Sequence, residues 1–531
     1  MDLELHLEHL QRLIDQGAAH LQGDLIEEQV ELYDLAFCTA EVKAAQALRR
    51  LAQSSESDVL DDLSAFYVAE VTANILNRFA LRPASYGFTE AELPRLGGLA
   101  ELFAPQSMMR LGQALYEHGL PEQPLEESQR IIRDTFREFS SAVVAPLAEQ
   151  IHREDQMVPD EILQPLRDMG CFGLSVPERF GGLKPDDHED SVGMVIVTEE
   201  LSRGSLAAAG SLITRPEIMA RAIMEGGTPE QQARWLPGIA AGEPLCAISV
   251  TEPNTGSDVA SVALRATPVE GGWLLNGGKT WCTFAGKAGL ILVLARTETD
   301  DQKAHRGLSL FVVNKPSDNG HSIDFTQSGG GRMTGRAIAT LGYRGMHSYE
   351  MFYDDFFVPD EDLIGESGGR GKGFYFTMRG FMGGRLQTAA RACGLMQAAM
   401  DDSVRYAQDR RVFGKAVADY PLSGTKIVKM AGHIAASRAF THEVAALMDK
   451  GEGAMEASLV KLIACRAAEW VTREAVQLHG GMGYAEETAV SRYFADARVL
   501  SIFEGAEETL AIRVVGKALV DQVTANRPKK V

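Results

Sequence analysis

Glu504 is the residue whose surroundings in the sequence best suit it to act as a base. It follows the apolar run VLSIF at 499–503 and precedes Gly505. A carboxylate buried beside apolar and aromatic side chains has its charged form disfavoured, which raises its pKa toward that of a useful base. Gly505 lets another group approach the backbone closely. The alternative interpretation is that Glu504 only complements the dipole at the start of a helix expected over 507–520.

Charge and cysteine content exclude several classes of protein. The formal net charge is -21 over 531 residues, which opposes binding to nucleic acid or to an anionic membrane. The 6 cysteines lie apart without CxxC or metal-finger spacing, so they indicate buried thiols and not disulfides or zinc ligands. The first residues are acidic and amphipathic, unlike a secretory signal or an Arg-rich transit peptide, and no apolar run has the length of a membrane span. We therefore expect a cytoplasmic protein.

The elements that must position Glu504 occur in the order helices, strands, helices. Residues 3–118 are predicted to be almost wholly helical, because apolar residues recur every three or four positions. Helices are predicted again between 127 and 244. Short β-rich runs with glycines between them occupy 246–358, which is typical of a compact antiparallel barrel or sandwich. The helical pattern returns after this region, at 373–410, 426–450, 456–478 and 507–520.

These changes of pattern predict four segments. They are an N-terminal helical extension at 1–122, a helical domain at 123–244, a β-domain at 245–366 and a C-terminal helical domain at 367–531. The sequence PEQP at 121–124 suits a linker. Strands and helices do not alternate as in parallel βαβ units, so we expect no Rossmann domain. The extension contains no group of residues whose types and spacing suggest catalysis, and we interpret it as a packing or lid element.

Five motifs in a fixed order carry a family resemblance. They are SVTEPNTGSD at 249–258, NGGKTWCT at 276–283, DRRVFGK at 409–415, QLHGGMGY at 477–484 and FEG at 503–505. From about residue 126 to residue 519 the chain resembles the acyl-CoA dehydrogenase flavoproteins. The resemblance implies a mixed, mainly α fold with an N-terminal helical domain, a middle antiparallel β-domain and a C-terminal four-helix bundle. It also implies FAD as cofactor and an acyl-CoA as substrate.

The first two motifs resemble the flavin-binding part of the family. In the family pattern Val250 and Thr251 lie along the edge of the flavin, Trp281 packs beside the ring, and Thr283 directs its hydroxyl to flavin N5. Residues 281 and 283 are two apart, which puts both side chains on one face of a regular strand. The alternatives are an ordinary core aromatic at Trp281 and an ordinary strand residue at Thr283.

The third and fourth motifs resemble the part of the family that holds the ADP portion of FAD. Arg410 and Phe413 match the pair that reaches the pyrophosphate and adenine of a neighbouring subunit's cofactor. Gln477, Gly480 and Gly481 match a loop that lies against the same ADP portion. The resemblance therefore implies a homo-oligomer, either a homodimer or a dimer of dimers.

The resemblance also implies the chemistry of Glu504. This residue removes the α-proton of an acyl-CoA thioester while the β-hydrogen leaves as hydride to flavin N5, which creates an α,β double bond. His479 is not assigned proton transfer. The electrons pass on to an electron-transferring flavoprotein. One alternative is an acyl-CoA oxidase, and a non-enzymatic alternative is a DNA-protecting flavoprotein homologue, which the charge of -21 disfavours.

Length and layout indicate a substrate class. Among family members with an N-terminal extension, this chain and its segment GYRGM at 342–346 are similar to those that convert (2S)-methylsuccinyl-CoA to mesaconyl-CoA in the ethylmalonyl-CoA pathway. The alternative is another short or branched acyl-CoA. A free substrate carboxylate needs a cation, and Arg215 is the candidate, unless it is a surface arginine at a helix end. Ser257 and Arg385 fall where the family contacts CoA, although Arg385 also suits a surface charge.

The sequence departs from the family pattern in two of the motifs. After Gly505 the family usually continues with a threonine and small or neutral residues, whereas this chain has Ala506, Glu507 and Glu508. The change removes a hydroxyl expected near FAD and adds two negative charges close to the proposed base. Thr255 stands where a smaller residue is usual.

Overall fold

The computed structural model describes residues 2–93, 95–298 and 301–525. The predicted segments 1–122, 245–366 and 367–531 include residues 1, 94, 299–300 and 526–531, which lie outside the described part. The chain divides into two compact units. The bundle unit comprises Met1–Asp134 and Thr388–Val531, and the β unit comprises Thr135–Gln387. The chain passes from one unit to the other within helices α5 (Glu127–Phe139) and α12 (Gly373–Asp409).

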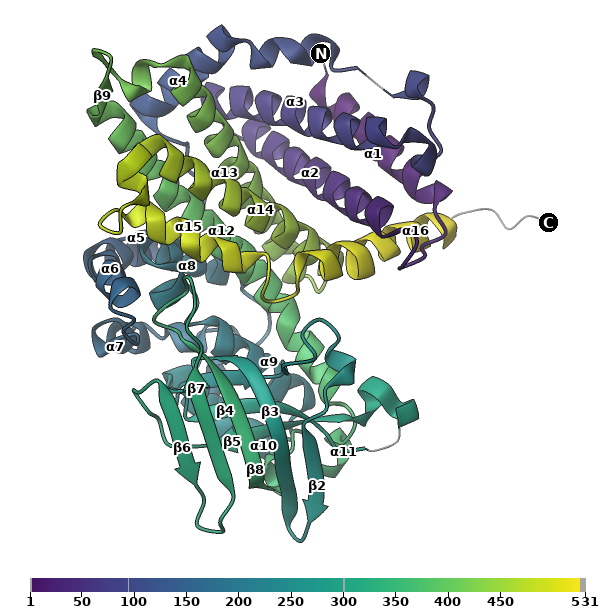
Figure 1. The fold of residues 1–531 in the computed structure, drawn as a ribbon, viewed down its shortest axis with the longest axis vertical. Coiled ribbons are helices and arrows are strands. Elements are labelled where there is room, and N and C mark those ends of the chain that lie inside the picture. Colours follow the sequence, from purple (N-terminus) through teal and green to yellow (C-terminus); the bar gives the residue numbers. More distant parts are fainter. Residues whose placement is uncertain (1, 94, 299–300, 526–531) are drawn as a thin grey trace, which may run out of the picture. The chain divides into compact units, whose positions relative to one another are not determined.

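The bundle unit is helical throughout its core (Figure 1). Besides parts of α5 and α12, its helices are α1 (Leu3–His20), α2 (Gln29–Gln53), α3 (Asp58–Leu81), α4 (Pro105–His118), α13 (Pro421–Met448), α14 (Ala454–His479), α15 (Ala489–Leu500) and α16 (Lys517–Ala525). The π-helical segment η13 (Thr509–Gly516) leads into α16. A short hairpin of β9 (Arg411–Val412) and β10 (Lys415–Ala416) precedes α13.

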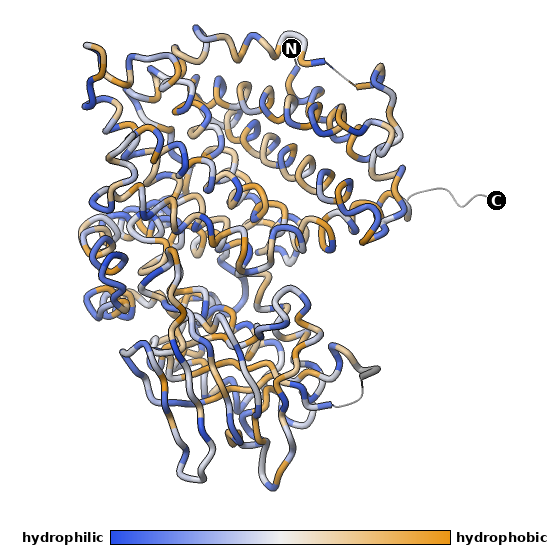
Figure 2. Tube along the Cα trace, viewed as in Figure 1, coloured by the Kyte–Doolittle hydropathy of each residue, from blue (hydrophilic) through white to orange (hydrophobic). Residues whose placement is uncertain are grey.

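The N-terminal extension shares one core with the C-terminal helices. Helix α2 packs against α3, α13, α14 and η13, while α4 packs on α13 and α1 packs on α16. The apolar side chains of α2 lie inside this core, with Leu32, Leu35 and Phe37 fully buried. Figure 2 shows hydrophobic and hydrophilic residues alternating around these helices. The apolar spacing of the extension thus produces a face that is covered by the C-terminal helices.

The β unit contains the remaining helices and the large sheet. Its helices are α6 (Ala145–Arg153), α7 (Asp160–Asp168), α8 (Ser191–Gly204), α9 (Thr214–Gly226), α10 (Pro229–Ala241) and α11 (Glu366–Gly369). Two π-helical segments, η4 (Ser140–Val144) and η7 (Leu206–Gly210), join helices at 139–145 and 204–214. Helix α10 begins as its sequence predicts, with Pro229 in the first turn and a capping box between Thr228 and Gln231.

The sheet of the β unit has eight strands in the order β1-β4-β2-β3-β8-β7-β6, and β5 also pairs with β4 (Figure 1). The strands are β1 (Cys246–Ser249), β2 (Arg265–Val269), β3 (Gly272–Thr283), β4 (Leu290–Arg296), β5 (Leu308–Asn314), β6 (Ser322–Thr326), β7 (Arg332–Ala337) and β8 (Ser348–Pro359). Most pairs are antiparallel, as expected for the middle domain, but β1 and β2 each pair with β4 in parallel. The sequence did not predict β6 and β7.

Both faces of β4 are buried. Leu290, Leu292 and Leu294 join a cluster with residues of α9 and α10. The alternate residues Ile291 and Val293 join the core between the strands. This burial on two sides explains why β4 is a continuous apolar run and not an alternating one. Among the described residues, no helix has both the length and the apolar character needed to cross a membrane.

Candidate functional site

The segment that follows β1 is held against β3. The Thr280 backbone N–H donates to the Thr251 carbonyl oxygen at 2.9 Å. Val250 is buried, whereas Thr251 is half-buried. Two of the family motifs, which lie about thirty positions apart in the sequence, therefore come together in the β unit through main-chain contact.

A buried ion pair holds this contact in place, and its two partners could not be paired from the sequence alone. Lys279 Nζ lies 2.9 Å from Glu252 Oε1 and donates to the Val250 carbonyl oxygen at 2.8 Å. The Glu252 carboxylate also accepts the backbone N–H groups of Ala263 and Leu264, each at 2.8 Å. Both residues stand inside quoted motifs, but only the sheet topology shows that they meet. Their pairing holds the Val250 segment in place.

Trp281 and Thr283 lie where β3 is irregular. The register of β3 with β8 shifts between Lys279 and Cys282, and Trp281 has a φ of 57°. The regular alternation on which the sequence prediction relied is therefore broken at this point. The Trp281 side chain is 54% exposed, whereas Thr283 is buried and its hydroxyl lies 2.9 Å from the Ser348 hydroxyl. Trp281 is thus not the core aromatic of the alternative interpretation.

In the bundle unit, Glu504 lies in the bend between α15 and the π-helical segment η13. Its side chain is half-buried and not enclosed as the sequence suggested. Its φ is 53°, in the left-handed region that costs a side-chain-bearing residue free energy. Within the described residues its carboxylate has neither a hydrogen bond nor an ion pair. The carboxylate is therefore free to accept a proton from a bound molecule.

The bend around Glu504 is held from both sides. Lys461 Nζ donates to the Gly505 carbonyl oxygen at 2.6 Å, and the Arg391 guanidinium carbon lies 4.7 Å from the centre of the Phe503 ring. Both cationic side chains are buried. A non-glycine residue keeps a positive φ only when its surroundings fix it, and these contacts supply that constraint.

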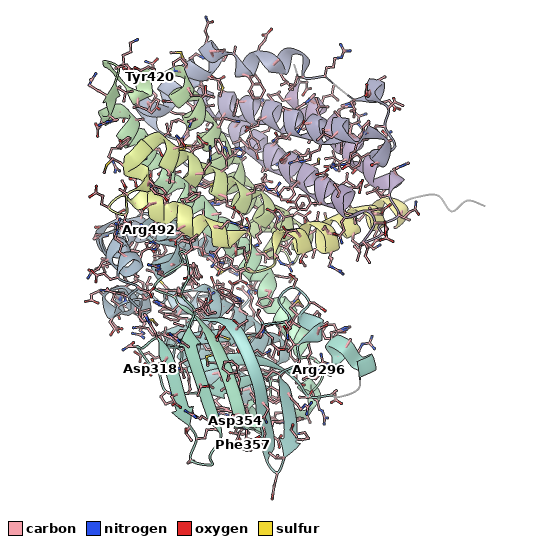
Figure 3. The ribbon with its side chains drawn as sticks, viewed as in Figure 1. Arg296, Asp318, Asp354, Phe357, Tyr420 and Arg492 are labelled. Carbon is pink, nitrogen blue, oxygen red and sulfur yellow. The ribbon has the colours of Figure 1, made fainter. Side chains whose placement is uncertain are left out.

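The residues expected near the ADP portion of FAD are exposed. Phe413 and Gly414 form the two-residue turn of the β9–β10 hairpin, with φ values of 49° and 83°. The Phe413 side chain is 98% exposed. Tyr420, labelled in Figure 3, steadies this hairpin by donating its hydroxyl to the Val412 carbonyl oxygen at 2.8 Å. Arg410 is exposed beside the hairpin.

The QLHGGMGY loop follows the end of α14. Gln477, Gly480 and Gly481 are exposed, and a Cβ placed on either glycine would meet no atom within 4 Å. His479 is buried, its Nδ1 lies 2.8 Å from the Ala475 carbonyl oxygen, and its ring stacks on Tyr406. Burial lowers the pKa of His479. These contacts agree with a structural role for His479.

Arg215 is buried, which excludes the surface arginine of the alternative interpretation. Its side chain lies on α9, is 6% exposed, and donates from Nη1 to the Ser211 carbonyl oxygen at 3.3 Å and to the Tyr343 hydroxyl at 3.2 Å. Within the described residues it forms no ion pair with an acidic side chain. Tyr343 belongs to the GYRGM segment, so the structure joins two features that the sequence analysis treated separately. Ser257 is exposed, and Arg385 is half-buried on α12.

The residues assigned to FAD fit that cofactor in each unit. In the β unit, Trp281 offers an aromatic surface that is more than half exposed, and the neighbouring Thr280 is bonded to Thr251. In the bundle unit, Gly480 and Gly481 leave open space at the backbone, and Arg410 supplies an exposed cation. An exposed aromatic, an exposed guanidinium and accessible glycines suit a flavin ring, a pyrophosphate and an adenine.

Comparisons with known proteins agree on one family. Family models match for the N-terminal domain of acyl-CoA dehydrogenase at 126–243, its middle domain at 247–356 and its C-terminal domain at 371–520. The chain is 43% identical over 398 residues to (2S)-methylsuccinyl-CoA dehydrogenase of Cereibacter sphaeroides, covering 75% of this chain and 70% of the relative. It is 32% identical to the mitochondrial 2-methylacyl-CoA dehydrogenase of Solanum tuberosum, covering 74% and 91%.

Solved structures give the same result. Butyryl-CoA dehydrogenase from Megasphaera elsdenii aligns with a TM-score of 0.68 and 28% identity, over 75% of this chain and 100% of that one. The glutaryl-coenzyme A dehydrogenase complex with glutaryl-CoA aligns with a TM-score of 0.68 and 27% identity, over 77% and 98%. A chain from a study of the electron transferring flavoprotein of Acidaminococcus fermentans aligns with a TM-score of 0.67 and 26% identity, over 77% and 100%.

Proposed function

Because the chain belongs to the acyl-CoA dehydrogenase family of FAD-dependent enzymes, we propose that it oxidises (2S)-methylsuccinyl-CoA to mesaconyl-CoA. The relative of 43% identity with that substrate in its name supports the proposal. The observation that carries it is the buried Arg215, which has no acidic partner among the described residues. A buried cation of this kind suits the free carboxylate of a dicarboxylic acyl-CoA.

In this proposal Glu504 removes the α-proton of the thioester. Three features support the assignment: the carboxylate is partly accessible, it is free of ion pairs within the described part of the chain, and it is held at a positive φ. The FAD, when bound, accepts the β-hydrogen together with its electron pair. The residues of the β unit proposed to orient it are Val250, Thr251, Trp281 and Thr283.

Other residues bind the remaining parts of cofactor and substrate in the proposal. Arg410, Phe413, Gln477, Gly480 and Gly481 hold the ADP portion of FAD, with Phe413 reaching a neighbouring subunit. Ser257 and Arg385 contact the CoA portion. The proposed electron acceptor is an electron-transferring flavoprotein, which the third structural comparison supports. An acyl-CoA oxidase instead consumes oxygen and releases peroxide, so an oxygen electrode separates the two.

Glu504→Gln tests the base. The substitution keeps the size of the side chain and removes its basicity, so we expect FAD to stay bound while anaerobic bleaching of the flavin by substrate slows by about 10²- to 10⁴-fold. Stopped-flow absorbance of the flavin measures this rate. Undiminished bleaching in the variant removes Glu504 from the proposed role.

Arg215→Ala tests the substrate class. Bleaching is followed with methylsuccinyl-CoA and with butyryl-CoA, which has no second carboxylate. We expect kcat/KM for methylsuccinyl-CoA to fall about ten- to hundredfold, because a charge-assisted hydrogen bond is lost, and the value for butyryl-CoA to change little. Arg385→Ala is the matched control, since loss of a CoA contact affects both substrates alike. Equal losses for both substrates in Arg215→Ala reject its role.

A further inference from the structure

The bend that carries Glu504 is bonded to the N-terminal extension. Glu507 Oε1 accepts the Tyr33 hydroxyl at 2.5 Å and the Arg466 Nη2 at 2.6 Å. Tyr33 lies on α2 of the extension and Arg466 lies on α14. Arg466 Nη2 also donates to the Tyr33 hydroxyl. Glu507 is one of the two acidic residues that depart from the family pattern, so the departure coincides with a contact to the added segment.

The three residues Tyr33, Arg466 and Glu507 form a cluster in which Arg466 and Glu507 stay charged and the hydrogen bonds stay formed. The Arg466 guanidinium carbon lies 3.4 Å from the centre of the Phe37 ring, one helical turn beyond Tyr33 on α2. A cation held on an aromatic face and bonded to a carboxylate forms strong charge-assisted hydrogen bonds. Burial raises the pKa of Tyr33 to about 12, and the hydrogen bond to Glu507 adds to this, so the phenol remains a donor.

Fixing Glu507 also fixes the bend. The Glu507 backbone N–H donates to the Ser501 carbonyl oxygen at 3.0 Å, which closes the segment 501–507 into a loop. Glu504 lies inside this loop at a positive φ, and the next residue, Gly505, is bonded to Lys461. A strained residue in a closed loop keeps its conformation only while both ends of the loop are anchored.

We propose that the N-terminal extension positions the loop 501–507, with Tyr33, Arg466 and Glu507 as positioning residues for Glu504. The inference rests on the proposed role of Glu504 as base. It gives the extension a part in turnover, in addition to its packing on the C-terminal helices. Since these residues act through Glu504, they affect the rate of proton removal more than substrate binding.

Tyr33→Phe in the full-length holoenzyme tests the proposal. The variant keeps the ring beside Arg466 and removes only the hydroxyl. We expect flavin reduction at saturating substrate to slow about tenfold, with KM and the midpoint of thermal unfolding nearly unchanged. Tyr116→Phe is the matched control, because the Tyr116 hydroxyl, on α4 of the extension, has no hydrogen-bond partner within the described part of the chain. We expect wild-type kinetics from the control.

Glu507 provides the second arm of the test. Glu507→Gln keeps an acceptor oxygen and is expected to retain more activity than Glu507→Ala. Because Tyr33 acts through Glu507, adding Tyr33→Phe to Glu507→Ala should not slow flavin reduction further. Wild-type flavin reduction in Tyr33→Phe overturns the positioning role. A thermal shift without a kinetic effect also overturns it. Failure of the base itself is distinguishable, because Glu504→Gln then reduces flavin normally whatever the Tyr33 and Glu507 variants do.

A separate observation in the β unit points to a metal site. Asp155, His321 and His347 each offer one possible ligand atom, and these atoms all lie within 4.8 Å of one another. His347 is 5% exposed, and its ring centre lies 4.5 Å from that of His321. Asp155 and His347 both have positive φ values, of 53° and 37°.

The two ring nitrogens of His347 both face oxygen acceptors. Nδ1 lies 3.3 Å from the Gly345 carbonyl oxygen, and Nε2 lies 3.2 Å from Asp155 Oδ1. A neutral imidazole carries one N–H, so it satisfies only one of these contacts. A cation bound by His347 Nε2, Asp155 and His321 takes the place of the second N–H. The Nδ1 N–H then donates to the Gly345 carbonyl oxygen, which is the usual support for a metal-bound histidine.

We infer that these three residues bind a divalent transition metal of the zinc class, which two imidazoles and one carboxylate suit. Arg344 Nε lies 3.6 Å from Asp155 Oδ1 and competes with a metal for this oxygen. Arg344 donates to the carbonyl oxygens of Thr340 and His152, and its Nε stays beyond hydrogen-bond distance of Asp155 Oδ1.

Zinc titration of the holoenzyme by calorimetry tests this site. We expect one site per chain in the wild type, its loss in His321→Gln, and its retention in His188→Gln. His188 is the matched control because its Nδ1 lies 2.7 Å from Asp187 Oδ1 but the residue belongs to no three-ligand cluster among the residues that the structure describes. His321 is exposed, so its substitution leaves the fold intact. Equal zinc binding by wild type and His321→Gln overturns the inference, as does the absence of binding in the wild type.

Discussion

At the level of single residues, the Glu252–Lys279 pair shows how the segment at Val250 and Thr251 is held in place. Two charges leave water when they are buried, and their attraction offsets this cost only where the remaining lone pairs and protons are also satisfied. Glu252 meets that condition through Lys279 and two backbone donors, and Lys279 through Glu252 and the Val250 carbonyl. Burial lowers the pKa of Lys279, and the attraction of Glu252 works against that change.

We predict that Lys279→Met strongly destabilises the β unit. The substitution leaves the Glu252 carboxylate buried without its cation, which costs about 3–5 kcal/mol. It also frees the Val250 segment, so FAD should be lost on gel filtration and the midpoint of thermal unfolding should fall. Arg332→Met is the control, because Arg332 pairs with Asp324 at 2.7 Å on the exposed hairpin of β6 and β7. Equal behaviour of the two variants contradicts the prediction.

The motifs that contain Glu252 and Lys279 could be recognised in the sequence, but the pairing of these two residues could not be predicted. Glu252 and Lys279 lie 27 positions apart, and only the register that brings the β1 segment to β3 makes them neighbours. The exposure of Trp281 could not be predicted either, because it depends on an irregularity in β3 and not on strand alternation. Likewise, the bonding of Glu507 to Tyr33 joins residues from opposite ends of the chain.

At the level of elements, the close crossing of α4 and α13 docks the extension. Gly112 on α4 lies so close to Gly424 on α13 that a Cβ added at Gly112 would come within 2.9 Å of the Gly424 Cα. The reverse is not true, because a Cβ added at Gly424 would meet only the Met108 carbonyl oxygen, at 3.9 Å. The backbone of α13 leaves room for nothing larger than hydrogen at Gly112.

We predict opposite effects for alanine at these two glycines. Gly112→Ala pushes α4 away from α13 and should destabilise the bundle unit by about 1–3 kcal/mol. Gly424→Ala fits without a clash and should stabilise it by about 0.5–1 kcal/mol, since alanine is the better helix former. Thermal unfolding of both variants measures the two shifts. Destabilisation by Gly424→Ala, or none by Gly112→Ala, contradicts this account of the crossing.

The helices and strands with strong apolar spacing could be predicted, and the polar ones could not. The stripes of α1, α2 and α3 and the runs of β4 and β5 follow directly from side-chain periodicity. Strands β6 and β7 each contain a single buried residue, Ile323 and Met333, and β7 is held in the sheet by its pairing with β8. Helix α15 was missed although it carried a signal, since Val490, Tyr493, Ala497 and Leu500 are buried at helical spacing.

At the level of the whole molecule, charge and surface limit its partners. The net charge of -21 opposes a polyanion such as DNA, which disfavours the nucleic-acid-protecting alternative. A flavoprotein surface of this charge is compatible with a second copy of the chain only where local apolar contact outweighs the repulsion. The tip of the β9–β10 hairpin is a candidate for such a contact, because the Phe413 side chain is almost completely exposed there.

We predict that Phe413→Ala weakens both self-association and FAD retention. A phenylalanine that becomes buried at an interface removes about 150–250 Å² of surface from water, and such an anchor commonly contributes about 2–4 kcal/mol to association. Light scattering coupled to gel filtration, with flavin absorbance recorded on the same column, measures the two effects together.

Leu422→Ala is the control, because Leu422 is 68% exposed on neighbouring α13 but is not at the hairpin tip. If Phe413 reaches a neighbouring subunit's cofactor, its loss lowers the oligomer and the bound flavin in parallel, and dilution of the wild type should release flavin as the oligomer dissociates. Unchanged mass and flavin content in Phe413→Ala, or equal losses in Leu422→Ala, would show that the hairpin tip is not an anchor.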